Sequence, residues 1–333
     1  MSGMRPPSKS KVSIQVDGRL HLGLVSMHAN ARRMNGGIGL GVAGVGATVQ
    51  AEVSERLSFV DNRRSAFSEA ELEHLRLNLS EAAELRNWTI AAAIQFSGDL
   101  PTHMGLGSGT ALRLAAIEAL SLINGDSLTR DELVRLSGRG GTSGIGIQTY
   151  FDGGLFMDLG VARQNAEYLP SSQVSRPQVP SVLPRLVMPN WNMVACLPKN
   201  IPTKSQAEEI AFFASTTPIP EIESHRAAYV ALFDIYASAL DADYKGFCEG
   251  IERMQATYWK SAEIGQYGEP LSQLRKAVSQ LGADCSGLSS LGPGIFALGS
   301  EDTLREICER EDELDCIAVP ILPSTEGRQV RCN

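Results

Sequence analysis

The sequence predicts an α+β protein built as two lobes, and three observations support this prediction. Alternating apolar and polar residues predict strands in the N-terminal part, first over residues 12–27. Helical periodicity dominates residues 205–281, and further strands are predicted before and after it. Three glycine-rich stretches, at residues 105–109, 139–146 and 285–294, separate regular elements. Strands and helices mixed in this order are typical of an α+β arrangement.

Length and composition fit a globular chain with more than one domain. The chain has 333 residues, of which 43% are hydrophobic and 20% are charged. Residues 1–11 are rich in Pro, Ser and Lys, and we expect a disordered lead-in there rather than a signal peptide. We expect an N-terminal domain over 12–175 and a C-terminal domain over 176–333. The weakly patterned segment 161–189 is expected to be a loop or lid.

Charge and cysteine usage narrow the class of protein. The net charge is −8 and no long basic run occurs, which argues against a nucleic-acid partner but leaves an anionic small substrate open. No window approaches eighteen consecutive apolar residues, so we expect no membrane association. Six cysteines without a Cys-x-x-Cys pair indicate reduced thiols, as expected for a cytoplasmic protein.

The first predicted elements are two strands, Val12–Val16 and Arg19–Met27, with a turn at Asp17-Gly18. Side chains alternate along a strand, so Arg19 and His21 share one face. That face is expected either to line an anion pocket or simply to meet solvent.

Glycines are dense just after these strands. Asn35-Gly36 is a turn signal, and four glycines in residues 36–41 predict backbone packed closely against a neighbour. Further on, Ser68 followed by Glu71 has the spacing of a capping box, which predicts a helix over residues 68–85.

The stretch from Pro101 to Thr110 predicts a loop that opens a buried helix over residues 110–122. Its glycines let backbone N–H groups approach a ligand, and Ser108 and Thr110 are good N-cap residues. Free N–H groups and the helix dipole together favour an anion such as phosphate. The alternative is a plain glycine-rich turn that caps a helix. The sequence matches neither the Walker A pattern nor the dinucleotide fingerprint.

The remaining helices are predicted from caps and periodicity. Thr129 is the expected cap of a helix ending at Gly138, and Arg139 opens the second glycine-rich stretch. The other predicted helices and strands are residues 205–214, 222–240, 244–258, 270–281 and 303–311, and 191–197, 295–298 and 316–322. We expect the three glycine-rich stretches to converge on one site.

The ordered motifs resemble those of the GHMP kinase superfamily, whose phosphate loop has the form Pro-x-x-x-Gly-Leu-Gly-Ser-Ser. Within it, they are most similar to the β-ribofuranosylaminobenzene 5′-phosphate synthases. The matching stretches are Arg19-Leu-His-Leu-Gly-Leu, Asn35-Gly-Gly-Ile-Gly, Gly105-Leu-Gly-Ser-Gly-Thr, Gly138-Arg-Gly, Ser143-Gly-Ile-Gly and Gly292-Pro293.

The resemblance implies a GHMP-kinase-like two-lobed fold and a decarboxylating C-glycosyltransferase. Enzymes of that family couple phosphoribosyl pyrophosphate to 4-hydroxybenzoate or 4-aminobenzoate in methanopterin synthesis, with loss of CO2 and pyrophosphate. The family usually has Asp where Ser26 and Asn35 stand, whereas its functional arginine is kept as Arg33. A more anionic acceptor would tolerate the missing carboxylate better. The expected function is therefore that of the C-nucleoside synthases of formycin and pyrazofurin biosynthesis, which use an aminopyrazole dicarboxylate.

The resemblance also implies a division of the site. The pyrophosphate and ribose phosphate would be bound by Gly105, Leu106, Gly107, Ser108, Gly109, Thr110, Arg139, Thr142, Ser143 and Gly144. The aromatic acceptor would be bound by Arg19, His21, Arg33, Asn35, Gly36, Ser289 and Ser290, with both serines as an alternative site for the 5-phosphate. His21 and Arg33 are the candidate catalytic residues, without an obligatory nucleophile. Asp158 and Glu208 could each bind a metal or transfer a proton, but neither is assigned a role, because exposed carboxylates are common.

Mg²⁺ is the expected metal, held mainly through the pyrophosphate, with Ser108 or Thr110 as a ligand. No organic cofactor is expected, and a homodimer is the expected assembly. Three alternatives remain open. The first is a β-ribofuranosylaminobenzene 5′-phosphate synthase that acts on 4-hydroxybenzoate or 4-aminobenzoate in methanopterin synthesis. The others are an ATP-dependent small-molecule kinase of the same superfamily and a non-catalytic small-molecule sensor.

Overall fold

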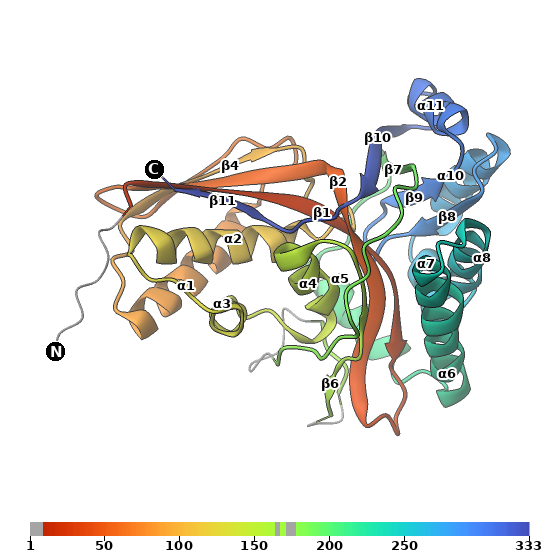
Figure 1. The fold of residues 1–333 in the computed structure, drawn as a ribbon, viewed down its shortest axis with the longest axis horizontal. Helices are drawn as coiled ribbons and strands as arrows, with labels where there is room; N and C mark the ends of the chain where they lie inside the picture. Colours follow the sequence, from red (N-terminus) through yellow and green to blue (C-terminus); the bar gives the residue numbers. More distant parts are fainter. Residues whose placement is uncertain (1–8, 164–166, 171–177, 333) are drawn as a thin grey trace.

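The computed structural model describes residues 9–163, 167–170 and 178–332. Two long strands, β1 (Lys11–Ser26) and β2 (Arg33–Val53), run through the centre of the molecule and connect its two halves (Figure 1). In Figure 1, helices α1, α2 and α3 lie below one end of these strands, and helices α6, α7, α8, α10 and α11 lie to the right of them. The α+β fold class is confirmed.

The Asp17-Gly18 pair bends β1 and does not reverse it, so the predicted turn is wrong. Residues on both sides of the pair continue to pair with β2, and the register shifts between Asp17 and Gly18. Such a bulge lets a long strand curve without losing its partner. The turn signal at Asn35-Gly36 likewise lies inside β2, with φ values of 66° and 67°. The chain reverses instead over residues 27–32.

One mixed sheet joins the two halves. Its central order is β11-β1-β2-β10-β7-β9-β8, and β4 and β5 also pair with β2. The strands beyond the central pair are β3 (Ser58–Asp61), β4 (Ala92–Gly98), β5 (Leu155–Asp158), β6 (Val161–Ala162), β7 (Met193–Pro198), β8 (Cys285–Leu288), β9 (Ile295–Leu298), β10 (Cys316–Pro323) and β11 (Gln329–Cys332). The C-terminal strand β11 therefore pairs with the first strand of the chain.

The N-terminal helices are α1 (Glu69–Arg86), α2 (Ser108–Ile123), α3 (Arg130–Leu136) and α4 (Gly144–Asp152). The capping box predicted at Ser68 is present, and the predicted cap Thr129 also forms a capping box, with Glu132. Helix α2 is buried along most of its length because most of its residues are apolar, and it packs on β1 and β2. This packing holds the N-terminus of α2 at a fixed place beside the central strands.

The C-terminal helices are α5 (Gln206–Thr216), α6 (Glu221–Tyr229), α7 (Ala237–Leu240), α8 (Tyr244–Gln255), α9 (Tyr258–Gly265), α10 (Gly268–Gln280) and α11 (Glu301–Glu309). The helix predicted over 222–240 is α6 and α7 joined by a π-helical segment, and α9 was not predicted. The expected domain boundary falls within residues 171–177, outside the described residues. Part of the expected lid, 161–189, also lies outside them. In the described ranges, no helix combines the length and apolar character needed to span a bilayer.

Candidate active site

The predicted phosphate loop forms the N-terminus of α2, as the sequence indicates. Gly105 and Gly107 have φ values of 78° and 81°, which side chains rarely adopt. Gly107 is the N-cap residue and no side chain caps this end, so the capping role predicted for Ser108 and Thr110 is wrong. Both hydroxyl residues lie one to three positions further on, inside the first turn and buried. An uncapped helix end presents N–H groups that an anion can accept.

The third glycine-rich stretch packs directly on this loop. The Ser289 hydroxyl donates to the Gly105 carbonyl oxygen at 2.7 Å, and the His21 N–H donates to the same hydroxyl at 3.0 Å. A Cβ on Gly105 would lie 2.1 Å from the Ser289 carbonyl oxygen, and one on Gly292 would lie 2.0 Å from the Gly105 nitrogen. Glycine is needed at both positions because the two backbones touch. Ser289 and Ser290 therefore lie against the phosphate loop.

The second glycine-rich stretch reaches the same helix end through Arg139. Its Nη2 and Nε donate to the Thr110 hydroxyl at 2.9 and 3.2 Å, and that hydroxyl lies 3.5 Å from the Ser143 Oγ. Burial lowers the pKa of the Arg139 guanidinium to about 9. Thr142 is half-buried in a short 3₁₀ turn, and Gly144 begins α4. The three stretches thus converge on the start of α2, as expected.

The loops bury His21 and partly cover Arg19, so this face of β1 is not the open polar face that was the alternative. The Arg19 Nη1 donates to the Gly105 carbonyl, whereas its buried Nε has no hydrogen-bond partner among the described residues. Burial lowers the pKa of Arg19 to about 10. His21 is 6% exposed, and its pKa is lowered well below the usual value by burial and by the charges of Arg19 and Lys260. The imidazole is therefore neutral near pH 7 and does not supply the cation expected for an acceptor carboxylate.

A buried ion pair in α9 adds to this cluster, and the sequence analysis missed it. Lys260 Nζ lies 2.6 Å from Glu263 Oε2 and donates to the Ser290 carbonyl at 3.4 Å. The only signal for it was the i, i+3 spacing of a lysine and a glutamate in a helix that had not been predicted. We call Arg19, Arg139 and Lys260, with the loop residues 105–110, the phosphate-loop cluster.

Arg33 belongs to a second group of residues, at the far end of β1 and β2. Its Nε donates to the Leu159 carbonyl at 2.7 Å, and its Nη2 donates to the Gly160 carbonyl at 2.7 Å and to the Ser181 hydroxyl at 3.0 Å. Arg33 is thus anchored to the chain after β5. This anchoring leaves the guanidinium partly exposed beside Asn35 and Gly36.

The two positions at which this chain departs from the family pattern face each other. Ser26 and Asn35 are direct partners in the β1–β2 ladder. The Ser26 hydroxyl donates to the Arg33 carbonyl at 2.6 Å, and the buried Asn35 Oδ1 has no hydrogen-bond partner in the ranges that the structure describes. Gly36 adjoins β5, because a Cβ there would lie 2.8 Å from the Asp158 carbonyl oxygen. Both departures therefore lie at the same place in the structure.

Asp158, to which the sequence analysis gave no role, is 2% exposed at the end of β5. Its Oδ1 accepts the Gly160 N–H at 2.6 Å, and its Oδ2 lies 1.7 Å from the position a Cβ on Gly144 would take. Burial raises the pKa of this carboxyl to about 7. A group that titrates near pH 7 is suited to proton transfer. The sequence gave no direct signal, because the burial depends on β5 pairing with β2.

Asp158 and His21 border the same part of the sheet. Asp158 pairs with Gly37 across the β2–β5 ladder, and the His21 Nε2 lies 3.1 Å from where a Cβ on Gly37 would be. We call Arg33, Asn35, Gly36 and Asp158 the acceptor region. It joins the phosphate-loop cluster through Gly144 and His21.

Comparisons with known proteins agree with this geometry. The family model of the GHMP kinases N terminal domain matches residues 72–152, which include the phosphate loop and the second glycine-rich stretch. The chain is 31% identical over 300 residues to the β-ribofuranosylphenol 5′-phosphate synthase of Archaeoglobus fulgidus, covering 88% of this chain and 91% of that protein. It is 30% identical over 295 residues to the enzyme of the same name from Methanothermobacter thermautotrophicus, covering 86% and 88%.

The chain belongs to the β-ribofuranosylphenol 5′-phosphate synthase family. Its fold is also that of L. major mevalonate kinase, with a TM-score of 0.72 at 15% identity over 97% of this chain and 100% of that one. At this identity the likeness shows the fold alone. The resemblance read from the motifs is thus confirmed for the superfamily and for this family.

In this family member, the Thr110 hydroxyl does not fit as a Mg²⁺ ligand, because it already accepts from Arg139 and lies near Ser143. The buried hydroxyl of Ser108 is the other candidate, and it can offer one oxygen. Mg²⁺ prefers six oxygen ligands, so most of them would come from the pyrophosphate and water.

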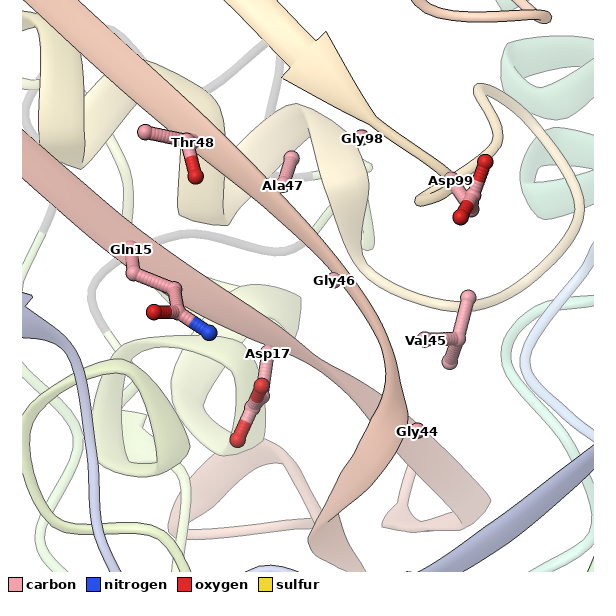
Figure 2. Close-up of a pocket in the computed structure, with 9 residues that line it drawn as sticks. All are labelled: Gln15, Asp17, Gly44, Val45, Gly46, Ala47, Thr48, Gly98 and Asp99. Atoms are coloured by element: carbon pink, nitrogen blue, oxygen red, sulfur yellow. The ribbon is translucent and has the colours of Figure 1, made fainter.

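A cavity of about 330 Å³ opens beside the bend of β1 and β2 (Figure 2). Figure 2 shows Asp17 and Gln15 on β1 and Asp99 after β4 at its rim. None of the predicted site residues lines it. The cavity is therefore separate from both halves of the candidate site.

Proposed function

We propose that the protein is a decarboxylating phosphoribosyltransferase that forms a carbon–carbon bond between phosphoribosyl pyrophosphate and an aromatic carboxylate. The observation that carries the proposal is the uncapped, glycine-lined start of α2, surrounded by Arg19, Arg139 and Lys260. The membership of the family supports the same reaction class.

In this proposal the phosphate-loop cluster binds the two phosphate groups of the donor. The N–H groups of the first turn of α2 and the Arg19 guanidinium, whose Nε is unpartnered, hold the pyrophosphate as it leaves C1. Arg139 stands beside the same helix end for the 5-phosphate, with Ser143 and Gly144. When bound, Mg²⁺ would neutralise charge on the leaving group.

The acceptor region then orients the ring. Arg33 pairs with the carboxylate of the acceptor. Asp158 accepts the proton of the hydroxyl or amine that lies para to this carboxylate on the ring, and loss of that proton makes the ring more nucleophilic. The carboxylate-bearing carbon attacks C1 as the bond to pyrophosphate breaks. Loss of CO2 returns the electron pair to the ring, and Asp158 returns the proton. No net proton is consumed.

The name of the relatives favours 4-hydroxybenzoate as the acceptor, because replacing the carboxylate of this ring by the ribose would leave a ribosylphenol. One observation favours a second candidate, the aminopyrazole dicarboxylate of C-nucleoside synthesis. Ser26 and Asn35 pair with each other across the β1–β2 ladder, and both are uncharged where the family usually has Asp. Repulsion of a second carboxylate on the acceptor is therefore lower.

A substrate panel tests the proposal. The purified protein is incubated with phosphoribosyl pyrophosphate and each acceptor, and release of pyrophosphate and CO2 is measured. ATP replaces the donor in a parallel reaction, with ADP as the readout. Equal release of pyrophosphate and CO2 supports the proposal, and the acceptor that gives it identifies the substrate. ADP formation alone would show a kinase, and binding without turnover would show a sensor.

The expected metal and assembly enter the same experiment. Activity is expected to disappear with excess EDTA and to return with Mg²⁺, and light scattering of the purified protein is expected to give the mass of a homodimer.

A further inference from the structure

A cluster of metal-ligating side chains lies away from the candidate active site, where the β1–β2 turn meets α6. His28 belongs to the turn, and Glu221 and His225 lie one helical turn apart on α6. The His28 Nδ1 lies 3.9 Å from Glu221 Oε2, and the His225 Nε2 lies 3.7 Å from Glu221 Oε1. One ligand atom from each residue can be chosen so that all three lie within 4.8 Å of one another.

The His28 ring is the unusual member. The residue is 8% exposed, and its buried Nδ1 has no hydrogen-bond partner within the described part of the chain. At 3.9 Å the Glu221 carboxylate is too far away to accept a hydrogen bond from it. Buried ring nitrogens are normally satisfied, so an unpartnered one facing a carboxylate and a second imidazole indicates a missing ligand.

The backbone that carries these groups is held in place from several sides. Ser224, between the two α6 ligands, donates to the Val25 carbonyl at 2.5 Å and accepts the Met27 N–H at 3.3 Å. The His28 carbonyl accepts the Tyr168 hydroxyl at 2.7 Å. The site is therefore built by fixed elements, and only the two exposed side chains need to move.

The Glu221 carboxylate also has an outer partner, because the Asn30 Nδ2 donates to its Oε2 at 3.0 Å. Hydrogen bonds of this kind orient metal-ligating carboxylates. Two imidazoles and one carboxylate suit zinc and its neighbours, whereas Mg²⁺ and Ca²⁺ prefer oxygen alone. Tetrahedral binding needs ligand atoms about 3.4 Å apart, as follows from metal–nitrogen distances near 2.0–2.1 Å. A rotation of the exposed Glu221 and His225 side chains would bring the three ligand atoms to this spacing.

We infer that His28, Glu221 and His225 form a binding site for a divalent transition metal of the zinc class, with water as the fourth ligand. The metal ties the β1–β2 turn to α6. This role is structural and does not depend on the proposed reaction. The same hairpin carries Ser26, Arg33 and Asn35, so the metal also stiffens the end of the acceptor region.

Metal titration tests the site. Protein dialysed against EDTA and then against buffer is titrated with Zn²⁺ by calorimetry, and with Co²⁺ by visible absorption. We expect one equivalent of Zn²⁺ and a higher thermal midpoint when it is bound. In His225→Ala and Glu221→Gln the dissociation constant should rise at least about tenfold and the thermal shift should disappear. Both residues are exposed, so these variants should fold.

Asn30→Ala tests the residue that orients Glu221, and we expect the affinity for Zn²⁺ to fall about tenfold in this variant. His74→Ala, which removes an exposed histidine of α1, is the matched control and should bind like the unmodified chain. Unchanged affinity in His225→Ala and Glu221→Gln would overturn the inference. A Co²⁺ spectrum with thiolate charge-transfer bands would also overturn it, because it would assign the metal to the free cysteines.

Discussion

The phosphate-loop cluster and the acceptor region lie beside the same two long strands but are built in different ways. In the cluster, backbone touches backbone, and Gly105 and Gly292 leave no room for a Cβ. In the acceptor region, one long side chain, Arg33, reaches across to two carbonyls and a hydroxyl. A backbone cradle tolerates few substitutions, whereas a region built from side chains can be altered one residue at a time. Under the proposed function, this contrast would let the acceptor change while the donor stays the same.

The largest effect is expected from breaking the cradle. Gly107→Val forces a side chain onto a residue with φ of 81°, where a Cβ would lie 2.7 Å from Arg19 Cγ. We expect kcat/KM to fall by about 10²–10³ or more, as for loss of an anion-stabilising donor. Binding of phosphoribosyl pyrophosphate, measured by calorimetry, should be lost.

Gly265→Ala is the matched control, because nothing lies within 4 Å of a Cβ at that position and its φ is ordinary. Circular dichroism of both variants checks the fold. Normal donor affinity in a folded Gly107→Val protein would show that the loop does not bind the pyrophosphate.

The next effect concerns the proton acceptor. Because burial raises the pKa of Asp158 to about 7, kcat/KM should rise with pH through that value. Asp158→Asn should lower kcat by about 10²–10⁴ and abolish this rise. An unchanged pH profile in the variant would exclude Asp158 as the base.

The same shift has a consequence for stability. The Asp158 carboxyl holds its proton more tightly in the folded protein than in the unfolded chain. Its contribution to the free energy of unfolding is therefore complete below about pH 4 and is lost as pH rises through 7. In Asp158→Asn, the free energy of unfolding should lose this dependence between pH 4 and 8. Urea titrations across that range measure it.

A pair of variants separates the two regions directly. Arg139→Met should raise KM for phosphoribosyl pyrophosphate about 10–100-fold, since a hydrogen bond to a charged group is worth about 1.5–3 kcal/mol. Arg33→Met should raise KM for the acceptor by a similar factor. Each variant should leave the other KM nearly unchanged. Equal effects on both constants would show that the two regions act as one.

The smallest effect is expected from Ser26→Asp, which restores the usual family residue opposite Asn35. A carboxylate here should disfavour a dicarboxylate acceptor relative to 4-hydroxybenzoate by about tenfold in kcat/KM, or about 1.4 kcal/mol. Competition between the two acceptors measures the ratio. Ser26→Ala, which adds no charge, should leave the ratio unchanged, and a change there would assign the effect to the lost hydroxyl.

What could be predicted from the sequence was mostly local. The capping boxes at Ser68, Thr129 and Ser205 are present because each depends on residues three apart. The loop at the start of α2 was found for the same reason. The convergence of the glycine-rich stretches was predicted only as the simplest arrangement, and the packing of Gly105 on Gly292 shows it.

What could not be predicted depends on distant partners. Asp17-Gly18 has the composition of a turn, but its pairing with β2 keeps the chain extended. Asp158 looks like any surface carboxylate until β5 adds to β2 and buries it. Lys260 and Glu263 are buried only because α9 lies against the third glycine-rich stretch. In each case the deciding contact lies far away in the sequence.

The pairing of β11 with β1 has a consequence for synthesis on the ribosome. Val12 pairs with Cys332, so this edge of β1 stays open until residues 329–332 have been synthesised and have left the exit tunnel. An open strand edge is a template for wrong pairing. The N-terminal part of the sheet therefore exposes an unpaired edge for as long as the C-terminal helices and strands are being made.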